Sequence, residues 1–168
     1  LSMNDPMKPL RALAVRHAKG RRTETAIPRI TITTMNEVTE HQFGLFQPMV
    51  CLILQGAKEV MIADRVLRYD PACYFVASME VPASGCIAQA SADAPYVGVT
   101  LALDRDMLAA LLPDAQTPVG EAAPSSFGVG AVTPDLLDAW LRLLRLLDAP
   151  ADVPVLAPLF EREILYRL

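Results

Sequence analysis

The residues of this chain that could carry chemistry are few: two histidines, His17 and His41, and three cysteines, Cys51, Cys73 and Cys86. A metal site needs three or four converging ligands, and one histidine beside the predicted strands does not supply them. A thiol–imidazole pair could be assembled from Cys51 and His41, but nothing in the sequence orients or activates it. We therefore interpret His41 as a loop residue and Cys51 as a core residue, and we predict no catalytic residue, no metal and no other cofactor.

The common catalytic motifs are missing as well. The sequence contains no G-x-S-x-G, no phosphate-binding glycine loop, no H-E-x-x-H and no paired-cysteine motif. The odd number of cysteines, all in apolar strand-like runs, favours reduced thiols in a cytoplasmic protein over a disulfide framework. No apolar run approaches the roughly 18 residues of a membrane-spanning helix, and no signal-peptide pattern opens the chain. We expect a cytoplasmic protein that does not contact membranes.

Composition limits the class further. Apolar residues make up 52% of the 168 residues and charged residues 20%, which is enough to bury the core of one domain and excludes global disorder. The net charge of −4 does not indicate the basic surface with which a protein binds the phosphates of nucleic acids. The basic residues gather near the start of the chain, where we interpret them as a solvated arm: Arg11, Arg16, Lys19, Arg21 and Arg22.

The elements that must position any site are mostly strands. After an arm at 1–26, which carries a short helix over 9–20, residues 27–132 hold runs rich in β-branched and apolar residues, with turn signals between them. No helix interrupts the main series, so a parallel βαβ architecture is disfavoured and a barrel or sandwich is predicted. The run at 48–55 is continuously apolar, as in a strand covered on both faces. The predicted strands are 29–35, 48–55, two around a turn within 58–70, 73–78, 85–91, 96–103 and a short one at 126–132, with 36–44 as a connection.

Helices follow the strands. Residues 104–112 predict a short helix capped by Asp104, and residues 113–125 read as loop. Residues 133–168 form a helical segment, in which Thr133 caps one helix and Asp152 caps the last. The last helix stops without a glycine, asparagine or proline beyond it, so we expect the natural protein to continue past residue 168.

The helix at 135–148 is apolar over roughly 220° of its circumference, wider than the stripe of roughly 100° that docks a surface helix on one core. Two interpretations remain open. The helix is either buried entirely within its own domain, or covered on one side by a second copy in a twofold dimer. We favour the dimer, with its interface at Leu137, Trp140, Leu144 and Leu147.

Residues 50–78 resemble the cupin pattern in their strand spacing, because Gly56 follows an apolar strand and Pro71 opens a turn into the next one. Metal-holding cupins place two histidines and a glutamate before that glycine and a third histidine after the proline turn. Here the corresponding positions fall on Gly44, Leu45 and Met49, and near Val76, and none of these side chains binds a metal. The resemblance implies a cupin-like scaffold that lacks the metal ligands needed for metal-dependent oxygenase or isomerase chemistry.

A closer resemblance covers residues 27–103, and more loosely the rest of the chain. "CLILQGAKEV" (51–60), "DRVLRYDPACYFVAS" (64–78) and "APYVGVTLALD" (94–104) are similar, in order, to the N-terminal domain of AraC-type transcription regulators. The tail "LAPLFEREILYRL" (156–168) resembles the linker helix that precedes their DNA-binding half. That half, with its two helix-turn-helix units, is not in this chain.

This resemblance implies a mainly β fold with C-terminal helices: a cupin-like β-barrel of jelly-roll type over 27–132, then an α-helical dimerisation hairpin over 133–168. It also implies a non-enzymatic domain that binds a small-molecule effector, forms a homodimer, or does both, and that meets DNA only through the absent domain. If the barrel interior binds the effector, strand parity selects six inward residues, which would otherwise be ordinary core: Cys51, Ile53, Tyr74, Val76, Tyr96 and Thr100. The few polar groups available, Tyr74, Tyr96, Thr100 and Gln55, favour a small carbonyl, aromatic or otherwise modestly polar effector.

Two other functions fit the same sequence. One is a small cupin-type enzyme with a degenerate or unusual metal site. The other is a barrel that binds no ligand and serves only to dimerise.

Overall fold

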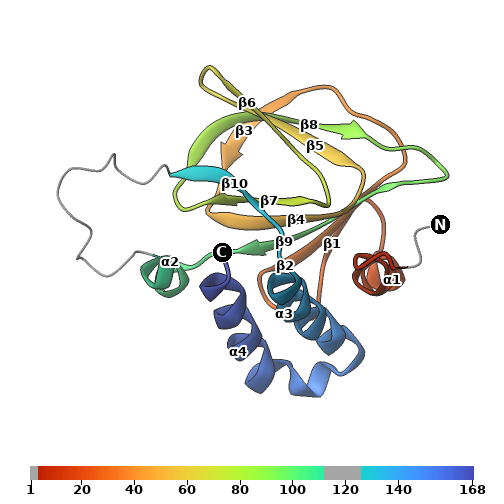
Figure 1. Cartoon of the computed structure of the whole chain (residues 1–168), viewed down its shortest axis with the longest axis vertical. Coiled ribbons are helices and arrows are strands. Elements are labelled where there is room, and N and C mark those ends of the chain that lie inside the picture. Colours follow the sequence, from red (N-terminus) through yellow and green to blue (C-terminus); the bar gives the residue numbers. More distant parts are fainter. Residues whose placement is uncertain (1–3, 112–125) are drawn as a thin grey trace.

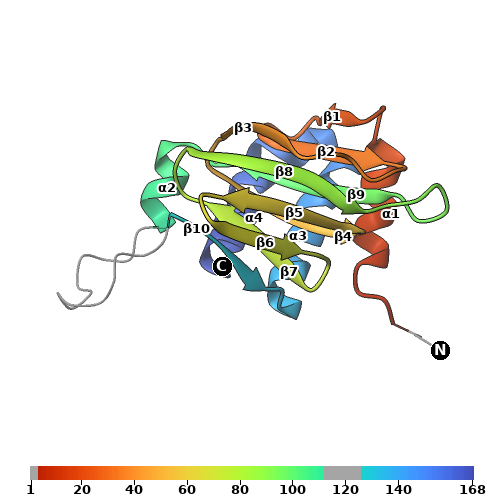
Figure 2. The same cartoon turned by 90° about the horizontal axis from the view of Figure 1, so that it is seen from above.

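Two antiparallel β-sheets face each other, and helices cover the outer face of the larger one (Figure 1). The computed structural model describes residues 4–111 and 126–168. The larger sheet has the strand order β1-β2-β9-β4-β7-β10 and the smaller one β3-β8-β5-β6 (Figure 2). The strands are β1 (Arg22–Glu24), β2 (Ile30–Met35), β3 (Gln42–Phe46), β4 (Met49–Gln55), β5 (Ala57–Ile62), β6 (Arg65–Tyr69), β7 (Cys73–Ala77), β8 (Val81–Gln89), β9 (Tyr96–Ala102) and β10 (Phe127–Ala131).

The predicted closed barrel is wrong in one respect: the two sheets do not close on each other. Within residues 4–111 and 126–168, no strand of the larger sheet pairs with a strand of the smaller one. The edge strands β1 and β10 pair only inward, with β2 and β7. The mainly β class with C-terminal helices is confirmed, and the architecture is an open pair of sheets.

Most predicted strands are present, and two were missed. β3 begins inside the stretch interpreted as a connection, where its sequence QFGLF carries a central glycine and no alternation of apolar and polar residues. β1 is only three residues long, with the sequence RTE, and lies in the segment interpreted as an arm. Both are held by pairing with a neighbour, β3 with β8 and β1 with β2, which local sequence does not reveal.

The core has two layers, one on each face of the six-stranded sheet. β4 serves both, which is why its sequence MVCLILQ is continuously apolar, as predicted. Its residues Val50, Leu52 and Leu54 face the helices, whereas Cys51 and Ile53 face the four-stranded sheet.

Three helices pack on the outer face of the larger sheet: α1 (Lys8–His17), α3 (Pro134–Arg145) and α4 (Val153–Tyr166) (Figure 1). A shorter helix, α2 (Arg105–Leu111), follows β9, and two 3-10 turns at Leu146–Asp148 and Pro150–Asp152 join α3 to α4. The predicted loop at 113–125 and the predicted helix end at 112 lie outside the described residues. Among the helices that are described, none has both the length and the apolarity to span a bilayer.

Two of the three predicted helix caps are confirmed. The Thr133 hydroxyl accepts a hydrogen bond from the Leu136 N–H at 3.2 Å, and the Asp104 carboxylate accepts one from the Met107 N–H at 2.9 Å. Asp152 makes no side-chain capping bond, because α4 is entered through a 3-10 turn. Its backbone there is already helical, with φ −86 and ψ −12, instead of the extended conformation that a capping residue adopts.

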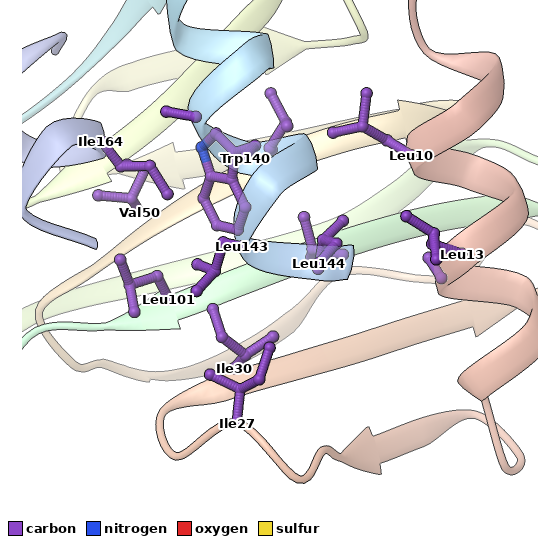
Figure 3. Close-up of a cluster of buried hydrophobic side chains, with 14 of the residues drawn as sticks. Leu10, Leu13, Ile27, Ile30, Val50, Leu101, Trp140, Leu143, Leu144 and Ile164 are labelled. Atoms are coloured by element: carbon purple, nitrogen blue, oxygen red, sulfur yellow. The ribbon is translucent and has the colours of Figure 1, made fainter. Parts of the chain in front are cut away.

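Helix α3 is buried within one chain (Figure 3). Trp140 and Leu144 are fully buried, and Leu137 and Leu147 are only 9% and 6% exposed. Their neighbours come from the sheet, from Leu10 and Leu13 of α1, and from Ile164 of α4. Within one chain, α1 and α4 cover the apolar arc that a second copy was expected to cover, and the dimer interface at Leu137, Trp140, Leu144 and Leu147 stays a prediction.

Candidate functional site

A cleft of about 860 Å³ lies between α1 and one end of the six-stranded sheet. At this end β2 finishes, β9 begins and β4 finishes, and pairing places Thr34 and Gln55 opposite Val97. Fourteen residues line the cleft: Lys8, Arg11, Ala12, Val15, Ala18, Gly20, Arg21, Thr34, Met35, Asn36, Glu37, Gln55, Pro95 and Val97.

One face of α1 forms a wall of the cleft. Lys8, Arg11, Ala12 and Val15 line it, at the i, i+3, i+4, i+7 spacing that places side chains on one side of a helix. The other face of α1, formed by Leu10, Leu13 and Ala14, is buried in the core. Because that buried face fixes the rotation of the helix, the lining face is held towards the cleft.

The cleft is positively charged. It is lined by three cations, Lys8, Arg11 and Arg21, and by one carboxylate, Glu37. The Arg11 guanidinium is oriented by hydrogen bonds to the Leu54 carbonyl at 3.3 Å and to Asp5 at 2.8 Å. The bond from Arg11 lowers the pKa of Asp5, so that carboxylate stays ionised at neutral pH. Part of the charge of Arg11 is thus already balanced.

Arg21 and Gln55 are also held in place around the cleft. The Arg21 Nε lies 3.0 Å from the Met35 sulfur, and the Gln55 amide donates to the Pro95 carbonyl at 2.8 Å. The remaining lining is largely apolar, formed by Ala12, Val15, Ala18, Met35, Pro95 and Val97. A largely apolar lining that also carries cations can hold a small organic anion with an apolar body.

Three of the six predicted ligand residues lie between the two sheets. Cys51, Ile53 and Tyr96 are 2%, 0% and 2% exposed, in a cluster with side chains from both sheets. Thr100 is half-buried and shares the strand face of Tyr96 by alternation along β9.

The inward direction predicted for Tyr74 and Val76 is wrong, because both pack in the helix-side cluster. The register of β4 with β7 explains this: Leu52 pairs with Tyr74 and Cys51 with Phe75, and directly paired residues point to the same face. Leu52 faces the helices, so Tyr74 does too.

Aromatic rings pack against one another among the aliphatic side chains between the sheets. Tyr69 stacks on Phe75 with ring centroids 5.4 Å apart, and Phe46 meets Phe75 edge-on at 6.4 Å. Burial raises the pKa values of Tyr69 and Tyr96 well above the ordinary value for tyrosine, so both phenols stay neutral. This environment is that of a core, and the six predicted residues do not line the cleft at α1.

The residues that give the cleft its charge were missed. Lys8 was not singled out, and Arg11 and Arg21 were assigned to a solvated arm, whereas α1 is part of the core and β1 is part of the sheet. One signal was present in the sequence. The apolar positions Leu10, Leu13 and Ala14 on one face of α1 leave Lys8, Arg11, Ala12 and Val15 together on the other.

The solved structures that match this chain are distant. ToxT from Vibrio cholerae O395 matches with a TM-score of 0.49 at 6% identity over 89% of this chain and 53% of its own. ToxT from V. cholerae strain SCE256 with a bound unsaturated fatty acid gives 0.48 and 7% over 79% and 51%. The AraC-like transcriptional activator CuxR gives 0.49 and 12% over 95% and 64%. The chain thus spans between about half and two thirds of these proteins.

The comparison with curated proteins gives no match. The family described as "AraC-type transcriptional regulator N-terminus" matches residues 26–168, which is most of the chain and includes both sheets apart from β1. This agrees with the resemblance carried by residues 51–60, 64–78 and 94–104. The chain belongs to the family of N-terminal domains of AraC-type transcriptional regulators.

Proposed function

We propose that this domain senses a small-molecule effector for a DNA-binding transcription regulator, and that the cleft beside α1 binds the effector. The observation that carries the proposal is the cleft itself: its volume is about 860 Å³, and its lining combines three cations with largely apolar side chains. Small-molecule sites in proteins have volumes of about 300–1,000 Å³ and combine an apolar lining with a few placed polar groups. The ligand class is a small organic acid with an apolar body, more charged than the modestly polar compound that the strands alone suggested.

Effector binding would act on a helix-turn-helix domain that lies in the longer regulator and not in this chain. An effector shifts such a protein only by its difference in affinity for two domain arrangements. An effector bound against the lining face of α1 would affect the packing of the other helices. This is because Leu10 and Leu13 of α1 share one core cluster with Leu144 of α3 and Ile164 of α4 (Figure 3).

The regulator would act as a homodimer, with α4 in the place first assigned to α3. Val155, Leu159 and Tyr166 are 70%, 58% and 80% exposed. At spacings of four and seven residues they lie along one side of the helix. An isologous contact of this stripe with its copy gives the twofold geometry expected for two DNA half-sites.

The test of the effector cleft is a thermal-shift and calorimetric screen of small organic acids, each paired with its neutral amide. An acid present at 100 times its Kd should stabilise the domain by about 2.7 kcal/mol, and its amide by much less. Lys8→Gln and Arg21→Gln should weaken binding of the same acid, and Val15→Trp should block it by filling the cleft.

The control is Arg105→Gln, which removes a cation from α2, away from the cleft, and should leave binding unchanged. The proposal fails if acids and amides stabilise equally, or if binding is the same in the Val15→Trp protein as in the wild type.

A further inference from the structure

A cluster of three potential metal ligands lies on the four-stranded sheet, on the face turned away from the six-stranded sheet. Glu59 of β5 and Cys86 of β8 are direct cross-strand partners, and His41 immediately precedes β3, which pairs with β8 on its other side. The neighbours Val60 and Ile87 point into the inter-sheet core, so alternation turns Glu59 and Cys86 outward. The strand order β3-β8-β5 in Figure 2 therefore brings the three side chains together.

The donor atoms converge on one place. The His41 Nε2 lies 3.0 Å from the Glu59 Oε1 and 3.4 Å from the Cys86 sulfur. The three donor atoms all lie within 4.8 Å of one another. Tetrahedral ligands bound to zinc at about 2.0–2.3 Å are separated from each other by about 3.3–3.8 Å. Small side-chain movements would therefore convert this cluster into a coordination shell.

The way the three groups meet distinguishes a metal site from a catalytic triad. A triad needs the thiol on one imidazole nitrogen and the carboxylate on the other. Here both Cys86 and Glu59 approach Nε2, while Nδ1 lies 3.1 Å from the Ser84 hydroxyl. A single nitrogen carries one proton or one lone pair, so it cannot satisfy both partners fully. A cation between the three donors satisfies all of them.

We propose that His41, Glu59 and Cys86 bind a divalent transition-metal ion of the zinc class, with a fourth position open to solvent. Nitrogen, sulfur and carboxylate oxygen together are ligands that Zn²⁺ and Co²⁺ accept. Ser84 orients the imidazole from behind, as partners of metal-bound histidines commonly do. The side chains of His41 and Glu59 are 35% and 30% exposed, which leaves a route for the ion. Among the described residues, the ion pairs of Glu59 are limited to His41, so its carboxylate is free to coordinate.

This site differs from the metal site expected of a cupin. The cupin positions fall on Gly44, Leu45, Met49 and Val76, whose side chains do not bind a metal. The interpretation of Cys51 as a core residue is confirmed, because Cys51 lies between the sheets, and the thiol beside His41 belongs to Cys86. The two ligands that join His41 lie 18 and 45 residues further along the chain, so only the sheet register reveals the cluster.

The test is titration of the reduced chain with Co²⁺ and with Zn²⁺. The wild type should bind one equivalent of Co²⁺ with a thiolate-to-cobalt charge-transfer band, and Zn²⁺ should displace the ion. Cys86→Ser should abolish the band, and His41→Asn and Glu59→Gln should weaken binding strongly. Ser84→Ala should weaken it by about 10–100-fold, as loss of an orienting partner does.

The chain supplies its own matched controls. Cys73→Ser and His17→Asn remove the same residue types elsewhere, and they should bind Co²⁺ like the wild type. All variants should keep the circular dichroism of the wild type, because the three ligands lie on the outer face. The proposal is overturned if the wild type shows no thiolate band, or if the band persists in Cys86→Ser or disappears in Cys73→Ser.

Discussion

Arg29 and Glu161 form an ion pair of 2.6 Å between the start of β2 and the middle of α4, 132 residues apart in sequence. The Glu161 side chain is only 5% exposed and that of Arg29 is 34% exposed. Asp104 lies 3.9 Å from the same guanidinium. The pair fixes α4, the last element of this chain, to the six-stranded sheet.

Removing the positive charge of this pair should destabilise the domain. In Arg29→Met the Glu161 carboxylate stays buried without its cation, which costs about 3 kcal/mol in comparable buried pairs. Chemical denaturation followed by circular dichroism measures the change in free energy of unfolding. The control is Arg16→Met at the exposed Arg16–Asp148 pair, where a loss of about 0–1 kcal/mol is expected. Equal losses in the two variants would contradict the structural role of the Arg29–Glu161 pair.

The same carboxylate should make stability depend on pH. Burial raises the pKa of Glu161 above its ordinary value of 4.5, although the hydrogen bond from Arg29 opposes this. Between 4.5 and the raised pKa, the folded protein binds more protons at this site than the unfolded chain, so this contribution to stability falls as pH rises. Unfolding measured over a pH series should show that the free-energy difference between wild type and Glu161→Gln shifts against the wild type from pH 4.5 upward. A difference that does not change with pH would contradict this assignment.

A side chain at Gly56, in the turn from β4 to β5, should destabilise the domain more than a side chain at another glycine with a positive φ. Its φ is +87°, and a Cβ there would lie 2.4 Å from the Gln89 carbonyl oxygen. Gly20 is the matched control, because its φ is +88° and a Cβ there would meet nothing within 4 Å. Both alanine variants carry a left-handed backbone cost of about 1–2 kcal/mol, and Gly56→Ala should lose about 1–3 kcal/mol more through overpacking. Thermal and urea unfolding of the two variants separate the cost of the clash from the cost of the backbone conformation. Equal losses of stability in Gly56→Ala and Gly20→Ala would contradict the clash at Gly56.

Charges on α3 and on α4 should have opposite consequences. Leu144→Asp places a carboxylate in the core and should prevent folding, since even Leu144→Ala should cost about 2–5 kcal/mol. Leu159→Asp changes a side chain that is 58% exposed and should leave the fold intact. If α4 carries the proposed dimer contact, sedimentation should show Leu159→Asp as a folded monomer and the wild type as a dimer. A folded Leu144→Asp protein would contradict the burial of α3.

Much of the fold could be predicted from local sequence. The double-sided burial of β4, the turn after Ile62 and the caps at Thr133 and Asp104 all follow from short-range patterns, and all are present. The number of sheet partners is not a local property. Thus the sequence did not predict β1 and β3, and it placed the Tyr74 side chain of β7 on the wrong face of the sheet.

The sites were harder to predict, because each is assembled by pairing register. The apolar arc of α3 was recognised correctly, but which surfaces cover it depends on where α1 lies in space. The cleft combines residues of α1 with the ends of three strands, and the cluster of His41, Glu59 and Cys86 combines residues of two neighbouring strands with the residue that precedes a third. Composition and spacing identify such residues only one at a time.

The two faces of α1 have different roles: one packs in the core and the other lines the cleft. Leu10, Leu13 and Ala14 anchor the helix, while Lys8, Ala12 and Val15 contact the cleft. If the cleft binds the proposed effector, substitutions on the second set should alter which compound is recognised without loosening the scaffold. A sensor built in this way can drift between chemical signals by changing single surface positions, while its architecture is inherited unchanged.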